Sequence, residues 1–283
     1  SKTIQVVMNG INLVVDGKPV SGDNILYEGT TYVPVRAVAE SLGKEVKWDA
    51  KTNTVEIGDA GPGLIEKNGI KVYTKAIQYK DAYMEVNLKI PVIEGMKNVE
   101  LMNRLNQELE KKALDFKKET ENITKEVVEE SKRQGWPLRT GSAYTEYKAW
   151  INYNQTMSIS VTYYQYTGGA HGITYKEAVN VDLVNGKELS LKELFAGSED
   201  YQQVITYELL KQMNNEEYLF PEAVRDFKAS DDLKFYLTDE GIVFYFDPYE
   251  VAPYASGIVE YKISYESLKD VLNENYVQRF LND

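Results

Sequence analysis

The sequence predicts an α+β protein, in which a small β-rich N-terminal domain precedes a larger domain of antiparallel sheet packed on helices. Three observations support this fold class. Short apolar runs separated by turn residues fill residues 1–58, an apolar stripe with helical spacing follows, and alternating apolar and polar residues recur from 144 to 265. Hydrophobic residues make up 43% of the 283 residues, which is enough for a sizeable core.

Residues 1–58 have the pattern of a compact β-rich domain. The apolar run 11–15 leads into Asp16-Gly17, a pair typical of a two-residue hairpin because glycine accepts positive φ. A short helix is predicted over 35–42, and Gly43 ends it. Further strands are predicted at 18–20, 31–35, 45–48 and 54–57.

A glycine-rich stretch marks the boundary between the two domains. Residues 58–69 contain four glycines and one proline, so we predict a linker at 59–69. Beyond it we expect two α+β subdomains. The first, 70–160, contains a long helix, and the second, 161–283, contains two unusual loops.

The long helix is predicted from about Val99 to Gln134, and Gly135-Trp136-Pro137 ends it. Its predicted buried stripe has one gap, at Thr120, and comprises Met102, Leu105, Leu109, Ala113, Phe116, Ile123 and Val127. Strands are predicted at 70–76, 83–91, 144–153, 157–165, 173–183, 187–189, 233–237, 242–246 and 258–265. Two more helices are predicted at 201–213 and 268–281.

The charge of the chain is acidic and uneven. Residues 1–58 hold six Lys or Arg and seven Asp or Glu, so −11 of the formal net charge of −12 falls on the remainder. An acidic surface repels phosphate backbones, which argues against a nucleic-acid partner. A basic ligand, including a basic protein, would be steered toward the larger domain.

The chain contains no cysteine, which excludes disulfides and thiolate chemistry. No apolar run reaches the roughly 18 residues of a membrane helix, and no signal peptide is visible. The sequence starts abruptly in a strand-like pattern at Ser1. We therefore expect a mature chain from which any signal or anchor has been removed.

The first unusual loop, 167–172, carries the single histidine, His171, among three glycines. Such a loop can form a backbone nest for an anion, with His171 contacting a ligand. The alternative is a strained hairpin in which His171 packs locally. One histidine cannot build a His-rich zinc or copper site, and the Gly-x-Ser-x-Gly elbow of a Ser-His-Asp triad is absent around it.

The second unusual loop, 247–257, holds two prolines after the predicted strand 242–246. Prolines stiffen a loop and reduce the entropy lost on binding, so Tyr249 and Tyr254 are candidates for stacking on a sugar or anchoring a protein. In the alternative, these rings close the end of the core. The candidate ligand-binding residues of the two loops are Gly168, Gly169, His171, Asp247, Tyr249 and Tyr254.

The sequence predicts no catalytic residue, metal site or cofactor. With 44 Asp and Glu residues, a carboxylate pair for glycoside hydrolysis is available in principle, but pairing cannot be inferred from sequence. Asp231-Asp232 and the acidic residues at 198–200 could bind calcium loosely. Helix N-terminal signals explain both better.

Residues 11–57 resemble the copper amine oxidase N-terminal-like domain of secreted Gram-positive proteins. The resemblance rests on the motifs VDGKPV (15–20), YVPVR (32–36), AESLG (39–43), VKWD (46–49) and VEI (55–57). It implies a stalk-like accessory domain. Residues 1–58 contain no His or Cys that could hold copper.

Residues 70–270 resemble the paired domains of unknown function in the extracellular part of the lysozyme-sensing anti-sigma-V factor. One of the pair also precedes the catalytic domain of some peptidoglycan deacetylases. The matching motifs are YTGGAHG (166–172) and FDPYEVAPYASG (246–257). The transmembrane helix and sigma-binding segment of the anti-sigma factor, and the deacetylase catalytic domain, have no counterpart in this sequence.

The resemblance implies a non-catalytic binding or sensing protein of the bacterial cell envelope, extracellular or on the cell surface. Its expected ligand is wall glycan or a protein such as lysozyme. Two other functions stay open at this point. One is a hydrolase acting on cell-wall polymer through acidic residues, and the other is a spacer module whose Tyr-rich loops only complete the core.

Overall fold

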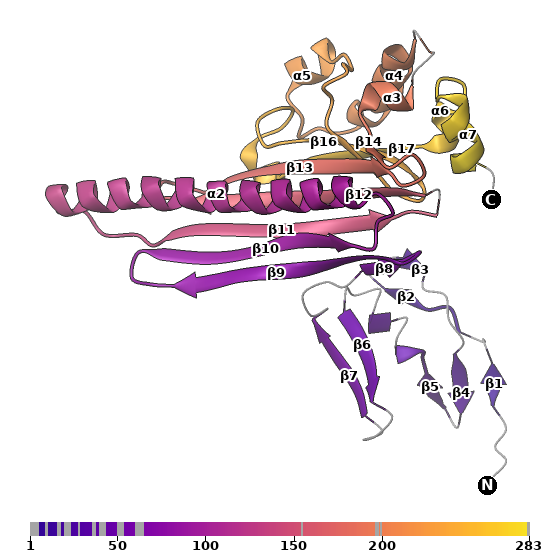
Figure 1. Cartoon of the computed structure of the whole chain (residues 1–283), viewed down its shortest axis with the longest axis horizontal. Helices are drawn as coiled ribbons and strands as arrows, with labels where there is room; N and C mark the ends of the chain where they lie inside the picture. The colour runs from indigo at the N-terminus through magenta and orange to yellow at the C-terminus, as the bar shows by residue number, and fades with distance from the viewer. Residues whose placement is uncertain are drawn as a thin grey trace. The chain divides into compact units, whose positions relative to one another are not determined.

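The computed structural model describes 65–281 except 154, 196–197 and 199, together with 6–8, 11–15, 18–19, 24–27, 29–35, 38–39, 44–49 and 54–59. The chain divides into two compact units, Ser1–Leu64 and Ile65–Asp283 (Figure 1). The predicted fold class is confirmed, because a small β-rich part precedes a larger part that contains a seven-stranded sheet, a second antiparallel sheet and helices.

The described residues of the first unit form short antiparallel strands. A three-stranded sheet has the order β1 (Val7–Met8), β4 (Ile25–Tyr27), β5 (Thr30–Tyr32), and two pairs join β2 (Val14–Val15) to β3 (Lys18–Pro19) and β6 (Lys44–Asp49) to β7 (Thr54–Asp59). The buried Asn24 side chain accepts from Ile11 N at 3.2 Å and donates to Ile11 O at 2.8 Å. The predicted Asp16-Gly17 turn and most of the predicted helix 35–42 lie outside the described residues.

The second unit is built on one large sheet. Its strands, in spatial order, are β14 (Lys187–Glu188), β13 (Ile173–Asp182), β12 (Thr156–Tyr166), β11 (Gly141–Ile151), β10 (Met84–Glu94), β9 (Ile70–Lys80) and β8 (Ile65–Lys67). β8 occupies residues that the sequence placed in the linker. Asn68 and Gly69 have φ of 57° and 78°, the geometry of a tight hairpin, so this Asn-Gly pair joins two strands. The predicted subdomain boundary at residue 160 lies within β12.

A single long helix, α2 (Val99–Gln134), connects β10 to β11. Asn98 caps its start, with Oδ1 accepting from Leu101 N at 3.0 Å, and Gly135 ends it at φ 68°. The 36 residues rise by about 1.5 Å each and carry the chain back along the sheet, so β11 starts beside Met84. β10 and β11 are therefore parallel, whereas the other neighbours in the sheet are antiparallel.

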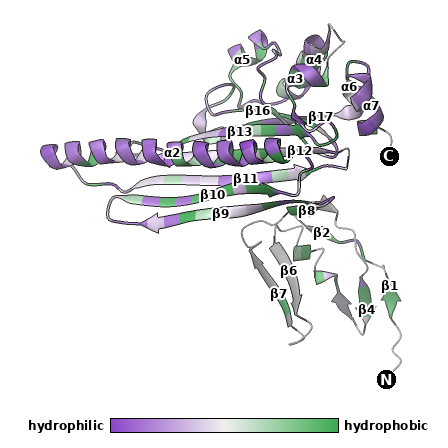
Figure 2. Ribbon diagram, in the orientation of Figure 1, coloured by the Kyte–Doolittle hydropathy of each residue, from purple (hydrophilic) through white to green (hydrophobic). Residues whose placement is uncertain are grey.

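The buried face of α2 differs from the predicted stripe. Leu105, Leu109, Ala113 and Phe116 are buried as predicted, but the face then continues through Thr120, Thr124, Val128 and Ser131, and Leu101 replaces Met102 at its start. Val127 is more than a third exposed. The predicted gap at Thr120 is thus part of the buried face. Figure 2 shows α2 as a mainly hydrophilic helix, and none of the described helices is long and apolar enough to cross a membrane.

A smaller sheet with the order β15 (Phe235–Leu237), β16 (Gly241–Phe246), β17 (Val259–Ser264) lies against the large one. Helices cover it: α3 (Leu191–Leu194), α4 (Tyr201–Met213), α5 (Pro221–Asp226), α6 (Tyr265–Leu268) and α7 (Glu274–Leu281), with a 3-10 turn η1 (Tyr254–Ser256). The predicted helix 268–281 is helical only at Leu268, where α6 ends, and from Glu274 onward as α7, which Asn273 starts with its Oδ1 accepting from Asn275 N at 3.0 Å.

Buried polar side chains join the two sheets. Ser158 Oγ accepts from Leu237 N at 2.9 Å, Asn180 Nδ2 donates to Phe235 O at 3.0 Å, and Asn152 Nδ2 donates to Leu237 O at 3.2 Å. Beside them Trp150 of β11 stacks on Tyr236 of β15, with ring centroids 4.3 Å apart. The backbone of β15 is therefore bonded by side chains of the large sheet.

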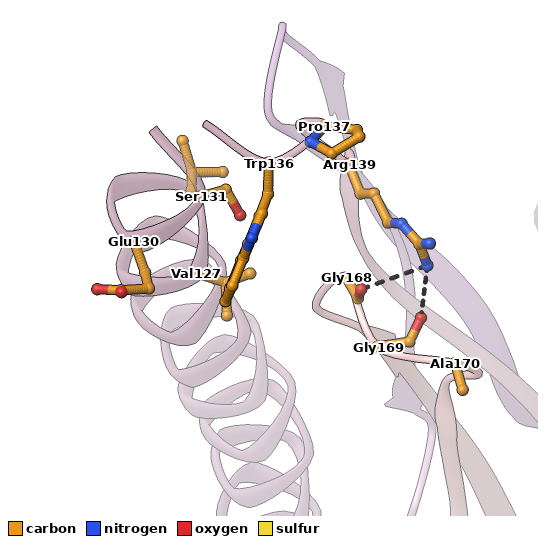
Figure 3. A pocket seen from close by; sticks show the side chains of 10 residues that line it. Val127, Glu130, Ser131, Trp136, Pro137, Arg139, Gly168, Gly169 and Ala170 are labelled. Carbon is orange, nitrogen blue, oxygen red and sulfur yellow. Dashed lines mark hydrogen bonds between the residues drawn. The ribbon is translucent and has the colours of Figure 1, made fainter. Parts of the chain in front are cut away.

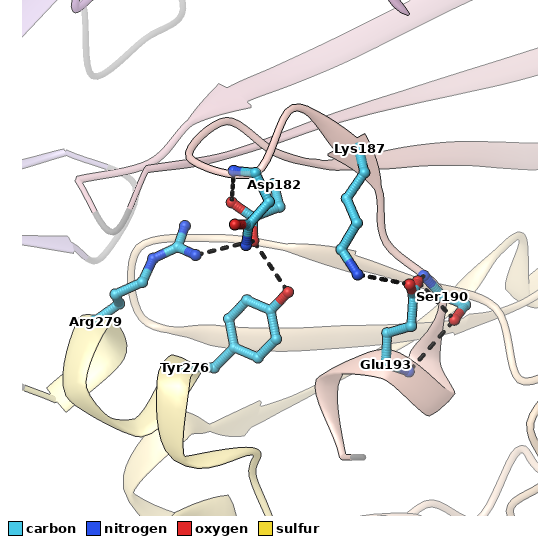
Figure 4. A network of polar contacts seen from close by, with 7 residues as sticks. Asp182, Lys187, Ser190, Glu193, Tyr276 and Arg279 are labelled. Carbon is cyan, nitrogen blue, oxygen red and sulfur yellow. Dashed lines mark hydrogen bonds and ion pairs between the residues drawn. The ribbon is translucent and has the colours of Figure 1, made fainter.

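Asp182, at the end of β13, fixes the last helix to the large sheet (Figure 4). Its side chain is fully buried, and its Oδ2 accepts from Arg279 at 3.0 Å, Tyr276 Oη at 3.1 Å and Asn185 Nδ2 at 2.7 Å. Its Oδ1 accepts from Val184 N at 2.9 Å. Burial raises the pKa of Asp182, but the hydrogen bonds from Arg279 and Asn185 outweigh it and hold the pKa below its usual value.

Candidate binding site

Four connections meet at one end of the large sheet, the end where α2 finishes (Figure 1). The strand register places 81–83, 135–140 and 167–172 there, because Met84 pairs with Gly141, Ser142 with Tyr166 and Gln165 with Ile173. The loop 247–257 joins them, since Asp247 Oδ1 accepts from Lys176 N of β13 at 2.8 Å. Both loops singled out in the sequence therefore lie at the same end.

The two loops bring three rings together, and we call His171, Tyr249 and Tyr254 the aromatic cluster. His171 stacks on Tyr254 with centroids 4.3 Å apart, and Tyr249 Oη lies 3.3 Å from His171 Nε2. His171 Nδ1 lies 2.7 Å from Gly172 O, which assigns the ring proton to Nδ1 and leaves Nε2 to accept from the Tyr249 hydroxyl. Tyr249 is 58% exposed, so the cluster lies on the surface.

Arg139 holds the loop that carries His171. Its guanidinium donates to Gly169 O at 2.9 Å, to Gly168 O at 3.4 Å and to Tyr166 Oη at 3.1 Å. Gly168 has a φ of 106°, which other residues rarely adopt. A side chain at Gly172 would lie 2.4 Å from the Tyr164 ring, so this glycine lets the loop settle directly on β12.

The loop that carries Tyr249 is held by ion pairs. Lys234 Nζ lies 2.6 Å from both Asp247 Oδ2 and Glu250 Oε1, and Glu250 Oε2 accepts from Asp247 N at 2.8 Å. Burial lowers the pKa of Lys234, but its bonds to the two carboxylates outweigh this and raise the pKa above its usual value. Both oxygens of Asp247 are thus engaged in fixing the loop, which makes it a positioning residue for the cluster.

A groove of about 600 Å³ lies between the end of α2 and the 168–170 loop (Figure 3). Its walls come from the end of α2, the connection 135–140 and the loop itself, and they include Val127, Glu130, Ser131, Trp136, Pro137, Arg139, Gly168, Gly169 and Ala170. Trp136 is 60% exposed. We interpreted Gly135-Trp136-Pro137 only as a helix stop. The tryptophan next to a proline directly after the helix was the sequence signal that could have indicated this groove.

The arrangement suits recognition by stacking and hydrogen bonding. Each ring of the cluster has an apolar face and a polar edge. Among the described residues, His171 bonds no carboxylate, and no three His, Asp or Glu side chains are grouped so that they could hold a metal ion. Asp247 and Glu250, the two carboxylates of the loop that carries Tyr249, are both paired with Lys234.

Three family models match successive parts of the chain, which confirms the resemblance seen in the sequence. They are described as Copper amine oxidase N-terminal domain (1–92), Deacetylase PdaC (77–174) and Protein of unknown function DUF3298 (192–266). His171 falls in the second match, and Tyr249 and Tyr254 fall in the third. The aromatic cluster is therefore assembled from two separately matched segments.

Two curated proteins of Bacillus subtilis (strain 168) are similar to the chain. The Peptidoglycan-N-acetylmuramic acid deacetylase PdaC is 28% identical over 249 residues, which cover 86% of this chain and 47% of the deacetylase. The Anti-sigma-V factor RsiV is 29% identical over 205 residues, which cover 68% of this chain and 67% of that protein. The chain thus spans about half the length of the deacetylase.

A solved structure supports the fold. The crystal structure of a DUF3298 family member from Bacteroides fragilis NCTC 9343 matches 77% of this chain and all of that chain, with a TM-score of 0.58 at 23% identity. At this identity the match describes the fold alone.

Proposed function

We propose that the chain is a non-catalytic binding or sensing module of the bacterial cell envelope, located outside the cytoplasm, which binds wall glycan at the aromatic cluster. The observation that carries this proposal is the convergence of His171, Tyr249 and Tyr254 on the surface from two distant loops. Sugars present apolar ring faces and polar hydroxyl edges, and stacked rings with polar edges match both.

The backbone around Tyr249 supports a role for its side chain. Tyr249 has a φ of 74°, a conformation that costs a non-glycine residue about 1 kcal/mol or more. It is maintained because Tyr249 N donates to Ala252 O at 2.9 Å and Glu250 N donates to Asp247 O at 3.0 Å. A strained tyrosine with an exposed ring beside His171 is expected where the ring has a function.

The similarity to a peptidoglycan deacetylase supports wall glycan as the ligand and the envelope as the location. The deacetylase activity itself is not proposed for this chain. The hydrolase alternative has less support, since Asp247 and Glu250 are both tied to Lys234. The spacer alternative has less support too, since Tyr249 contributes mostly exposed surface rather than core.

A basic protein is the second candidate ligand. The charge of −11 beyond residue 58 and the similarity to an anti-sigma-V factor favour it, with lysozyme as the example. Binding of this kind would weaken with rising salt, because charge steering is screened. Stacking of sugar rings on the cluster does not depend on steering by charge and would change little.

Binding assays on the full chain test the proposal. Sedimentation with insoluble peptidoglycan and calorimetric titration with soluble glycan fragments and with lysozyme are compared for the wild type and Tyr249→Asn. Asparagine tolerates positive φ, so the backbone is kept while the ring is lost. Glycan affinity should fall at least about tenfold, or about 1.4 kcal/mol.

The matched control is Tyr207→Asn, which removes a ring that is 66% exposed on α4 and should leave binding unchanged. Mass spectrometry of the incubated glycan tests the hydrolase alternative, for which shortened or deacetylated products are expected. Absence of glycan binding by the wild type would sink the proposal, and binding of lysozyme alone would favour the second candidate.

A further inference from the structure

We infer that the ligand is a linear glycan of more than one disaccharide, which crosses the 168–170 loop and occupies both the aromatic cluster and the Trp136 groove. This inference rests on the proposed function and specifies its ligand. The two surfaces share one short loop. Gly168, Gly169 and Ala170 line the groove (Figure 3), and the next residue, His171, belongs to the cluster.

Gly169, at the exposed part of this loop, is the residue that suggests a crossing. A Cβ at Gly169 would meet only His171 O, at 3.8 Å, and its φ lies outside the left-handed region. Among the described residues, neither a steric contact nor a positive φ therefore requires a glycine there. Glycine also occurs where a ligand approaches the backbone closely, and a polymer lying across the loop would need such a bare backbone.

The neighbouring glycines differ from Gly169 in this respect. Gly168 has a φ of 106°, and its Cβ would lie 3.2 Å from Val127 Cγ1, while a Cβ at Gly172 would lie 2.4 Å from the Tyr164 ring. The fold explains both of these. Arg139 also donates hydrogen bonds to the carbonyls of Gly168 and Gly169, so the loop is held in one position between the groove and the aromatic cluster.

The groove has the chemistry of a sugar subsite. Val127, Trp136 and Pro137 give it an apolar wall, whereas the Ser131 hydroxyl and the Arg139 guanidinium add polar groups to its lining. Its volume of about 600 Å³ lies in the usual range of small-ligand sites, roughly 300–1,000 Å³. An amphipathic wall of this size fits a sugar unit with an apolar face and polar substituents.

Calorimetric titration of the full chain with a disaccharide and a tetrasaccharide of N-acetylglucosamine and N-acetylmuramic acid tests the inference. The tetrasaccharide should bind at least about tenfold more tightly, because its second half binds intramolecularly. Gly169→Val should remove that gain by blocking the crossing, and Trp136→Ala should remove it by deleting the subsite wall. Trp136→Ala should keep the disaccharide affinity within about twofold, because the disaccharide binds at the aromatic cluster.

Thermal unfolding of each variant shows that the fold is retained, and Tyr207→Ala is the control for loss of an exposed ring. If Gly169→Val unfolds early, Trp136→Ala carries the test, because its side chain is largely exposed. Equal affinity for the two sugars, or a tetrasaccharide gain that survives in Trp136→Ala, overturns the crossing but leaves glycan binding at the cluster intact. Failure of both sugars to bind overturns the proposed function itself.

Discussion

Replacing Asp182 with alanine should destabilise the larger unit strongly. The carboxylate is fully buried and accepts hydrogen bonds from Arg279, Tyr276 and Asn185. Removing one partner of a buried ion pair costs about 3–5 kcal/mol, because the other charge stays in a poorly solvated place. The Arg279 side chain is 18% exposed, so water compensates in part and we expect about 3 kcal/mol.

Urea unfolding followed by circular dichroism measures this loss. For a unit of this size, about 3 kcal/mol corresponds to a fall in Tm of roughly 6–12 °C. The control is Asp226→Ala, which removes a largely exposed carboxylate paired with Arg225 and should cost far less than Asp182→Ala. If Asp182→Ala cost no more than this control, the interpretation of Asp182 as the anchor of α7 would be refuted.

Two further predictions follow from buried polar groups. Because the folded-state pKa of Asp182 is depressed, its stabilisation is present above the usual value of about 3.8 and is lost as pH falls through the folded pKa. The difference in unfolding free energy between the wild type and Asp182→Asn should therefore shrink below about pH 4, and a constant difference from pH 7 to pH 3 would contradict this. The Thr124 hydroxyl is buried without a hydrogen-bond partner among the described residues, whereas Thr120 Oγ1 donates to Phe116 O at 2.8 Å. Thr124→Val should leave Tm unchanged or higher and Thr120→Val should lose about 1 kcal/mol, so equal losses in thermal unfolding would count against this assignment.

The long helix and most strands of the larger unit could be predicted from residue patterns. The bounds of α2 match, because Asn98 and Gly135 are strong capping residues. The prediction of its buried face was wrong beyond Phe116. The apolar residues Ile123 and Val127 fitted the helical spacing closely enough to be assigned to that face. The helix instead buries the small Thr124 where it meets Gly141 of β11, a tertiary contact that periodicity does not contain.

The pairing of strands and the meeting of loops depend on distant parts of the chain. The parallel pair β10–β11 results from the length of α2, which carries the chain back to the start of β10. The helix was predicted at this length, but the pairing of β11 with β10 was not. The residues of the two loops were predicted, but their proximity depends on Lys176 of β13 bonding Asp247 after β16. The Trp136 groove was missed because residues 127–139 and the loop 168–170, which are distant in the sequence, form its walls together.

The bonds that join β15 to the large sheet also determine how the chain can be divided. Phe235 and Leu237 offer backbone groups that Ser158, Asn180 and Asn152 satisfy from the other sheet. A polypeptide restricted to 192–266 would lack these partners and expose a bare strand edge, a template on which further copies add as strands. The two matched segments therefore belong to one folding unit, and a fragment that keeps this fold has to contain both of them.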